Sequence, residues 1–208
     1  MKLKLKVCGM RDNKNILEVA ALSPDFMGFI FYEKSKRYVG EIFFIPKEFP
    51  TDINRVGVFV NEKIETILKQ VAKHQLNFVQ LHGDESAEDC RVLKSKTKVI
   101  KAFGIDEDFD FKILNEYKPY VDFFLFDTKT KNYGGTGKTF DWSLLKKYDQ
   151  QIPFFLSGGL SLENIEEAKN INGLNLYGLD VNSKAELSPG FKDISILKSI
   201  FNILNTDY

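Results

Sequence analysis

The feature that most constrains the fold is an alternation, along the whole chain, between short apolar runs and longer amphipathic runs. The apolar runs are rich in β-branched and aromatic residues, which favours strands. They occupy residues 3–8, 26–31, 55–60, 78–82, 99–103, 121–127, 153–157 and 176–181. The helical period appears between them at residues 62–74, 86–94, 141–149, 161–171 and 193–204. Such alternation is typical of a parallel sheet covered by helices.

The amphipathic segments differ in how clearly their ends are marked. Ser86 and Ser161 stand where helix N-caps are expected, because a serine hydroxyl accepts a hydrogen bond from a free backbone N–H. Residues 41–49, by contrast, have a poor helical period and contain Pro46. We expect this segment to be irregular or a short helix.

Eight strands with helices between them admit a closed (β/α)₈ barrel or an open doubly wound sheet. Dividing 208 residues among eight units gives about 26 residues each, near the short end of barrel sizes. The glycine pattern of dinucleotide-binding sheets, G-x-G-x-x-G, does not follow the first strand. We therefore predict an α/β protein, a single (β/α)₈ TIM barrel with parallel strands, as one domain over residues 1–208.

The stretch GGTGKT at 134–139 looks like the end of a nucleotide-binding P-loop, G-x-x-x-x-G-K-[ST]. The first glycine of that motif would fall at position 132, which is Asn132, and the preceding strand candidate already ends at Asp127. The spacing therefore argues against a P-loop. In a barrel these residues follow the sixth strand, where we expect a mobile flap over the mouth.

Composition narrows the classes of partner. Lys+Arg and Asp+Glu balance at 29 each, so no basic excess indicates nucleic-acid binding or polybasic membrane attachment. The N-terminal lysine alternation is unlike a signal peptide, and no apolar run approaches a membrane span. Two cysteines suit a reducing compartment. We expect a cytoplasmic monomer or homodimer that binds neither nucleic acid nor membrane.

Two residues at the C-terminal ends of predicted strands carry reactive groups. In a TIM barrel the active site lies at this face. Cys8 is either a small buried hydrophobe or, beside a cation, a thiolate that acts as a base. Asp127 is either a loop cap or a partly desolvated acid that donates a proton near neutral pH. An acid and a base across a barrel mouth suit an isomerase. Cys90, in a helical pattern, is expected in the core.

Two glycines, Gly158 and Gly159, stand between a predicted strand and a helix predicted to start at Ser161. Free backbone N–H groups at such a start attract phosphate, and barrels often use the loops after strands 7 and 8 for this purpose. Residues 180–184 would supply the second half of the site. The alternative is a plain turn with a helix cap.

Charged and imidazole side chains give weaker signals. Arg37 is either a solvated loop charge or a bidentate partner for a substrate carboxylate. His74 and His82 are too few and too isolated for a zinc site, and we expect His82 to be a hydrogen-bonded wall residue. No metal or cofactor is indicated.

Seven blocks together resemble the phosphoribosylanthranilate isomerase family, from Lys6 to Asp193, in order and at similar spacing. They are KVCGM, GFIFYEKSKRYV, VGVFVN, VQLHGDE, LFDTKTKNYGGTGKTFDW, FFLSGGL and GLDVNSKAELSPGFKD. The resemblance implies a (β/α)₈ barrel of tryptophan biosynthesis. It implies an Amadori rearrangement, without a cofactor, of N-(5-phosphoribosyl)anthranilate to 1-(2-carboxyphenylamino)-1-deoxyribulose 5-phosphate.

The same resemblance implies roles for single residues. Asp127 is the general acid that protonates the ribose ring oxygen, and the Cys8 thiolate takes the proton from the neighbouring carbon. Arg37 meets the anthranilate carboxylate, and the GGTGKT stretch is a lid. The phosphate and sugar contacts fall on the backbone amides of Gly158, Gly159, Asn182 and Ser183 and on the carboxylate of Asp180.

One position departs from the family pattern, and rival families fit less well. Lys184 replaces a usual glycine, which is awkward if the backbone there needs a positive φ, although its charge could also favour phosphate. Related sugar-phosphate barrels would want a lysine acid at a strand end or an aspartate in place of Cys8. A non-catalytic phosphate-binding barrel is the other alternative, and it would lack the acid or the base.

Overall fold

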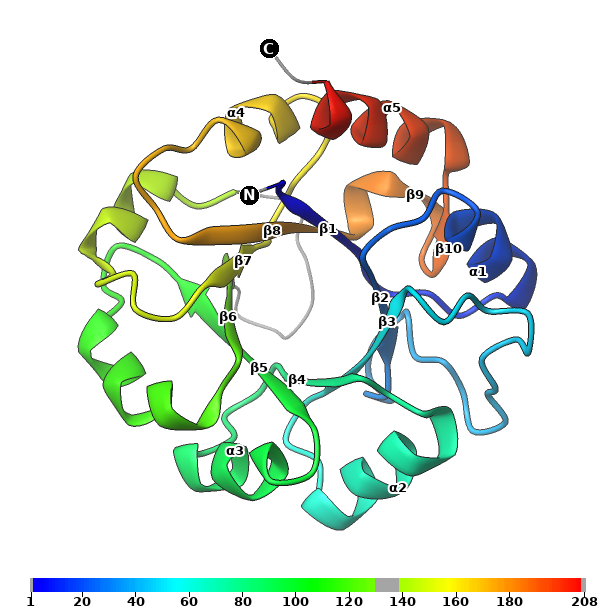
Figure 1. Ribbon diagram of the computed structural model, residues 1–208, viewed down its shortest axis with the longest axis horizontal. Coiled ribbons are helices and arrows are strands. Elements are labelled where there is room, and N and C mark those ends of the chain that lie inside the picture. The colour runs from blue at the N-terminus through cyan, green and yellow to red at the C-terminus, as the bar shows by residue number, and fades with distance from the viewer. Residues whose placement is uncertain (1, 130–138, 207–208) are drawn as a thin grey trace.

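Eight parallel strands close into a barrel in sequence order, with helices around the outside (Figure 1). The computed structural model describes residues 2–129 and 139–206. The strands are β1 (Lys4–Val7), β2 (Phe26–Ile30), β3 (Asn54–Phe59), β4 (Phe78–Leu81), β5 (Lys98–Ile105), β6 (Phe123–Thr128), β7 (Phe154–Leu156) and β8 (Leu176–Val181). The predicted fold class is confirmed, and every predicted strand overlaps an observed one.

Helices and 3₁₀ turns connect the strands. The α-helices are α1 (Asn13–Ala20), α2 (Ile64–His74), α3 (Ala87–Lys94), α4 (Ile165–Lys169) and α5 (Ile194–Asn205). The 3₁₀ helices cover Phe111–Glu116, Lys118–Tyr120, Trp142–Lys147 and Ser183–Ala185, and the antiparallel strands β9 (Glu186–Ser188) and β10 (Phe191–Lys192) follow β8. In the described ranges, no helix is long and apolar enough to cross a membrane.

Three predicted helices are confirmed within two residues of their expected ends, those at 62–74, 86–94 and 193–204. Ser86 is confirmed as the N-cap of α3, because its hydroxyl accepts from the Asp89 amide while Asp89 accepts from the Ser86 amide. Residues 41–49 contain turns but no helix, as expected. Helix α1 was not among the predicted segments.

Two predicted helices are wrong in type or extent. Residues 141–149 form only a short 3₁₀ helix, because the Gln150 side chain donates to the carbonyls of Leu145 and Tyr148 and ends the segment. Ser161 is not a helix N-cap. The Asn164 side chain ties a turn together by accepting from the Ser161 amide and donating to the Gly159 carbonyl, so α4 begins only at Ile165.

An aromatic cluster fills the barrel interior near the strand N-termini. Phe26 meets Phe78 and Phe155 edge-on, with ring centroids 5.3 and 5.2 Å apart. Val56, Ile100 and Leu125 pack into the same cluster. A second, larger apolar layer lies between the barrel and its helices. The inner cluster fills the N-terminal half of the barrel interior, so the polar side chains at the strand C-termini lie above a layer of buried apolar side chains.

Candidate active site

One cavity at the C-terminal ends of the strands collects all nine residues predicted for the site. The predicted catalytic and substrate-binding residues that line it are Cys8, Arg37, His82, Asp127, Gly158, Gly159, Asp180, Asn182 and Ser183. Asp127 and Asp180 belong to β6 and β8, and the others lie in the segments that follow β1, β2, β4, β7 and β8. The glycine-rich stretch predicted as a flap, 134–139, lies outside the described residues except for Thr139.

Cys8 lies directly after β1, where its amide donates to the Val181 carbonyl of β8 at 2.9 Å. Its sulfur occupies space that only a glycine at position 28 leaves free, since a Cβ on Gly28 would lie 2.6 Å from it. Burial raises the pKa of the Cys8 thiol, while the charge of Lys6 opposes this increase. The cation expected beside the cysteine is present, but burial outweighs it.

Lys6 and Asp180 form a buried ion pair beneath this cysteine. The register of β1 against β8 places the two residues opposite each other, and their Nζ and Oδ1 atoms are 2.9 Å apart. Burial alone would lower the pKa of Lys6, but Asp180 and Cys8 together raise it. Burial raises the pKa of Asp180 despite the Lys6 charge. The pair therefore places a fixed ammonium group under the cavity floor.

Asp127 ends in the same cavity from β6. Its Oδ1 atom accepts from the Thr128 amide at 2.7 Å, and its Oδ2 atom lies 3.5 Å from Nε2 of His82. On the other side of the imidazole, Nε2 of Gln80 lies 2.8 Å from Nδ1. Because Gln80 donates from Nε2, the neutral His82 ring carries its proton on Nε2, facing Asp127. His82 is thus the hydrogen-bonded wall residue expected from sequence.

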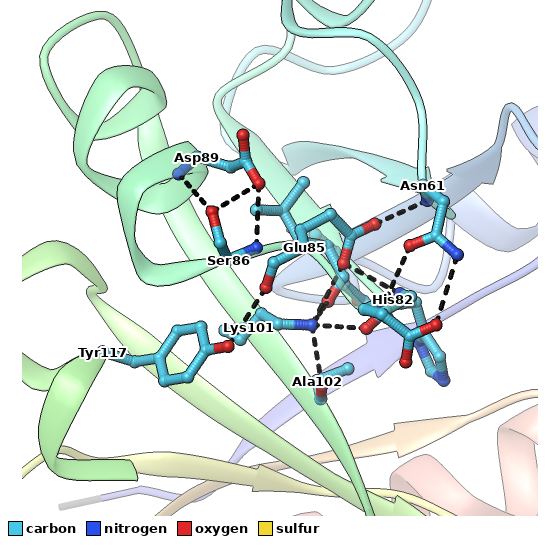
Figure 2. A network of polar contacts seen from close by, with 12 residues as sticks. Asn61, His82, Glu85, Ser86, Asp89, Lys101, Ala102 and Tyr117 are labelled. Atoms are coloured by element: carbon cyan, nitrogen blue, oxygen red, sulfur yellow. Dashed lines mark hydrogen bonds and ion pairs between the residues drawn. The ribbon is translucent and has the colours of Figure 1, made fainter. Parts of the chain in front are cut away.

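A buried lysine fixes the loop that carries His82 (Figure 2). The Lys101 ammonium group lies 2.7 Å from the Gly83 carbonyl and 3.0 Å from Oε2 of Glu85. Glu85 in turn accepts from the backbone amides of Asn61 and Gly83, at 2.8 and 2.9 Å. These contacts join the loops after β3 and β4 to the middle of β5, so they hold the His82 backbone in place.

Free backbone amides lie on the β7–β8 side of the cavity. Within the described residues, the amides of Gly158, Gly159 and Ser183 donate no hydrogen bond to another residue. Gly158 has φ +92°, and a Cβ there would lie 2.8 Å from Oδ1 of Asp127. Only glycine therefore lets the backbone pass so close to the candidate acid. Unpaired amides beside a cavity form a concave donor set that suits phosphate.

Lys184 causes no backbone strain. It lies exposed in the Ser183–Ala185 3₁₀ turn and is not among the described residues with positive φ. The concern that a lysine cannot replace the usual glycine is therefore removed. Cys90 is fully buried in the core, as predicted, and burial raises its pKa to about 12. In residues 2–129 and 139–206, no three His, Cys, Asp or Glu side chains come together as a metal site.

The comparison with protein families agrees with this arrangement. The model of a family described as N-(5'-phosphoribosyl)anthranilate (PRA) isomerase matches residues 5–203. The chain belongs to this family. The predicted family and the prediction of an isomerase are thus confirmed.

Relatives and solved structures cover nearly the whole chain. A protein from Parabacteroides distasonis named N-(5'-phosphoribosyl)anthranilate isomerase is 46% identical over 201 residues, covering 94% of this chain and 90% of the relative. The crystal structure of phosphoribosyl anthranilate isomerase from Thermotoga maritima has a TM-score of 0.85 at 38% identity, covering 97% of this chain and 98% of that one. An isomerase of this name in complex with reduced 1-(o-carboxyphenylamino)-1-deoxyribulose 5-phosphate has a TM-score of 0.81 at 35% identity and covers the same shares.

Sequence reasoning missed three polar residues at the site. Glu186 and Lys192 lie behind Arg37, and Gln80 orients His82. The alternation of β4 could have indicated Gln80, because its side chain lies on the same face as that of His82, two residues later. Glu186 and Lys192 gave no such signal, since the arginine that Glu186 pairs with lies 149 residues away in the chain.

Proposed function

We propose that this chain is a cytoplasmic phosphoribosylanthranilate isomerase of tryptophan biosynthesis. It converts N-(5-phosphoribosyl)anthranilate into 1-(2-carboxyphenylamino)-1-deoxyribulose 5-phosphate. The observation that carries the proposal is that Cys8 and Asp127 reach one cavity from non-adjacent strands of the barrel. That cavity also contains a guanidinium group and a set of free amides, which suit the two anionic ends of this substrate.

The two ends of the cavity differ in chemistry. The apolar side chains of Ile30, Val58 and Val60 lie on the β2–β3 side, and Arg37 enters the cavity from the loop after β2, with its guanidinium group against Glu186. They suit an aromatic ring that carries a carboxylate, because an arginine pairs with carboxylate in bidentate geometry. The amides after β7 and β8 suit the phosphate, and the Asp180 carboxylate, which lines the same cavity, suits the sugar hydroxyls as an acceptor. The reacting carbons would then lie between Cys8 and Asp127.

The reaction needs one acid and one base. Protonated Asp127 donates its proton to the ribose ring oxygen, the C1–O bond breaks, and the anthranilate nitrogen forms a protonated Schiff base with C1. The Cys8 thiolate then takes the proton from C2, and the electron pair neutralises the nitrogen to give an enolamine. Loss of the enol proton and protonation at C1 yield the ketone. General acid–base steps of this kind each contribute about 10²–10⁴-fold.

Substrate fluorescence tests this assignment. The loss of fluorescence of freshly made phosphoribosylanthranilate would be followed for wild type, Cys8→Ser and Asp127→Asn. We expect turnover in wild type and a fall of roughly 10²-fold or more in either variant, with circular dichroism unchanged. Cys90→Ala and Asp122→Asn are matched controls, since Cys90 is in the core and Asp122 precedes β6 at the opposite end of the barrel.

The outcomes separate the alternatives. A wild type that binds the substrate without turnover would identify a non-catalytic phosphate-binding barrel and overturn the proposal. Activity that survives in Cys8→Ala would remove the cysteine as the base, while the proposed overall reaction would stand. Loss of activity in the two control variants as well would show that the assay reports stability rather than chemistry.

A further inference from the structure

The arginine predicted to bind a carboxylate already holds one from the protein. Nε of Arg37 lies 2.9 Å from Oε1 of Glu186, and Nη2 lies 2.7 Å from Oε2. This is a bidentate pair along one edge of the guanidinium group. A guanidinium group has a second edge, between Nη1 and Nη2, and Nη1 donates to no other described residue. The Nη1–Nη2 edge of Arg37 is therefore left for a ligand, with two N–H groups that can donate side by side.

Glu186 is shared between two cations. Nζ of Lys192 lies 2.6 Å from Oε1 of Glu186 and 2.7 Å from Oδ1 of Asn182. The side chains of Lys192 and Glu186 are 0% and 4% exposed, so neither charge is screened by bulk water. Two cations and one carboxylate leave a single positive charge. Without Lys192, Glu186 would cancel the charge that Arg37 could offer to a ligand.

The charge states of the cluster are consistent with this arrangement. Burial would raise the pKa of Glu186, but hydrogen bonds from Arg37 and the charge of Lys192 lower it below its usual range. Burial lowers the pKa of Lys192 to about 8, against the opposing effect of Glu186. Near neutral pH the carboxylate is thus ionised and the lysine is charged. The buried cluster is held together by ionic hydrogen bonds.

We propose that Glu186, neutralised by Lys192, is a positioning residue that turns the Nη1–Nη2 edge of Arg37 toward the carboxylate of the substrate's aromatic ring. The inference rests on the proposed function and deepens it. It explains how the site recognises the ring carboxylate through a buried clamp, by which we mean the Arg37–Glu186–Lys192 cluster. Glu186 itself touches no substrate. It restricts a flexible side chain to one orientation, which lowers the entropy lost when the ligand binds.

The proposal predicts the opposite of simple charge counting. Replacing Glu186 by methionine removes a negative charge, so long-range electrostatics alone would strengthen the binding of any anion. If the clamp aims Arg37, the same substitution weakens binding, and only for ligands that carry the ring carboxylate. Binding of the phosphate end should change little, because the amides of Gly158 and Gly159 make no hydrogen bond with Arg37, Glu186 or Lys192.

Two ligands isolate the carboxylate. One is reduced 1-(o-carboxyphenylamino)-1-deoxyribulose 5-phosphate, and the other is the same compound with an unsubstituted phenyl ring. Their dissociation constants would be measured by calorimetry at pH 7 for wild type, Arg37→Met and Glu186→Met. The matched control is Asp25→Asn, which breaks a part-buried ion pair with Lys4 at the opposite end of the barrel.

We expect wild type and Asp25→Asn to prefer the carboxylated ligand by at least about tenfold, and Arg37→Met to lose this preference. Glu186→Met should lose most of the preference while binding the phenyl compound as wild type does. An unchanged or larger preference in Glu186→Met overturns the inference, as does equal loss of both ligands in a folded variant. If Glu186→Met fails to fold, the double variant Glu186→Met/Lys192→Met removes the stranded ammonium, and the same criteria apply.

A measurement of turnover distinguishes failure of this inference from failure of the proposed function. Wild type that isomerises phosphoribosylanthranilate, together with Glu186→Met that keeps its ligand preference, overturns the positioning role and leaves the function intact. Wild type without turnover overturns the proposed function whatever the ligand preference. A rise in KM of Glu186→Met with little change in kcat is the expected kinetic result, because the clamp acts on binding.

Discussion

Acidification should destabilise this protein through a histidine that the proposed chemistry does not use. His74 ends α2 and lies 4% exposed against Phe31 and Phe43, with ring centroids 5.3 and 5.5 Å apart. Burial lowers the pKa of His74 from 6.5 to about 4, and the neighbouring Lys73 acts in the same direction. The folded protein therefore keeps this imidazole neutral at pH values where an unfolded chain protonates it.

The sign and size of the effect follow from proton linkage. Between pH 6.5 and about 4 the unfolded chain binds more protons at this residue, so the free energy of unfolding falls as the pH falls. One pKa unit corresponds to about 1.4 kcal/mol, which gives a loss of at most about 3 kcal/mol at pH 4. The loss would be smaller if the carboxylates of Glu33, Glu41 and Glu62, which line the adjoining cavity, turned toward a charged ring.

Urea unfolding across this pH range measures the effect. Wild type would be compared with His74→Phe, which keeps an aromatic ring without a titrating nitrogen, and with His74→Leu, which controls for ring size. Carboxylates also titrate here, but they do so in all three proteins. We expect wild type to lose more unfolding free energy than either variant as the pH falls. Parallel curves for the three proteins would refute the argument that buried His74 stays neutral.

Two further predictions concern the site. Lys6→Met removes the main charge that opposes the raised pKa of Cys8, so the alkaline rise of kcat/KM with pH should move to higher pH, as a pH–rate profile would show. An unmoved profile would mean that another group is the base. Gly158→Ala should lower kcat by about 10²-fold, because the new Cβ would lie 2.4 Å from Oγ1 of Thr128 and 2.8 Å from Oδ1 of Asp127 and displace the acid. Gly173→Ala is the control, since Gly173 also has a positive φ but open space around it. Similar kcat losses in both variants would point to backbone strain instead.

The barrel and most of its site could be predicted because local patterns carry them. Strands such as FMGFIF and VDFFLFD are marked by apolar β-branched and aromatic residues, and the period of the helices separates them. In a parallel barrel all strand C-termini lie at one face, so Cys8 and Asp127 had to meet there once the fold was known. The same logic brought Gly158 and Asp180 to the cavity.

The burial of charged side chains could not be predicted, because a lysine in a strand pattern normally indicates a side chain that faces solvent. Lys6 and Lys101 are nearly completely buried, and each has a carboxylate partner more than fifteen residues away in the chain. Which lysine meets which carboxylate depends on strand register, such as the pairing of Lys6 with Asp180. The prediction of an α-helix at 141–149 was wrong for a similar reason. The Gln150 side chain that ends the 3₁₀ helix there belongs to the following loop, so the helical pattern does not include it.

Charge counting at the cavity explains why a chain of zero net charge can suit an anionic substrate. Three cations, Lys6, Arg37 and Lys192, face three carboxylates, those of Asp127, Asp180 and Glu186. When all six are ionised their charges cancel, so no broad positive field from them attracts the ligand. In the state that the proposed reaction requires, Asp127 is protonated and Cys8 is a thiolate, so the charges again sum to zero. Recognition in this arrangement depends on where donors point, namely the free edge of Arg37 and the amides of Gly158 and its neighbours, rather than on how many charges the site holds.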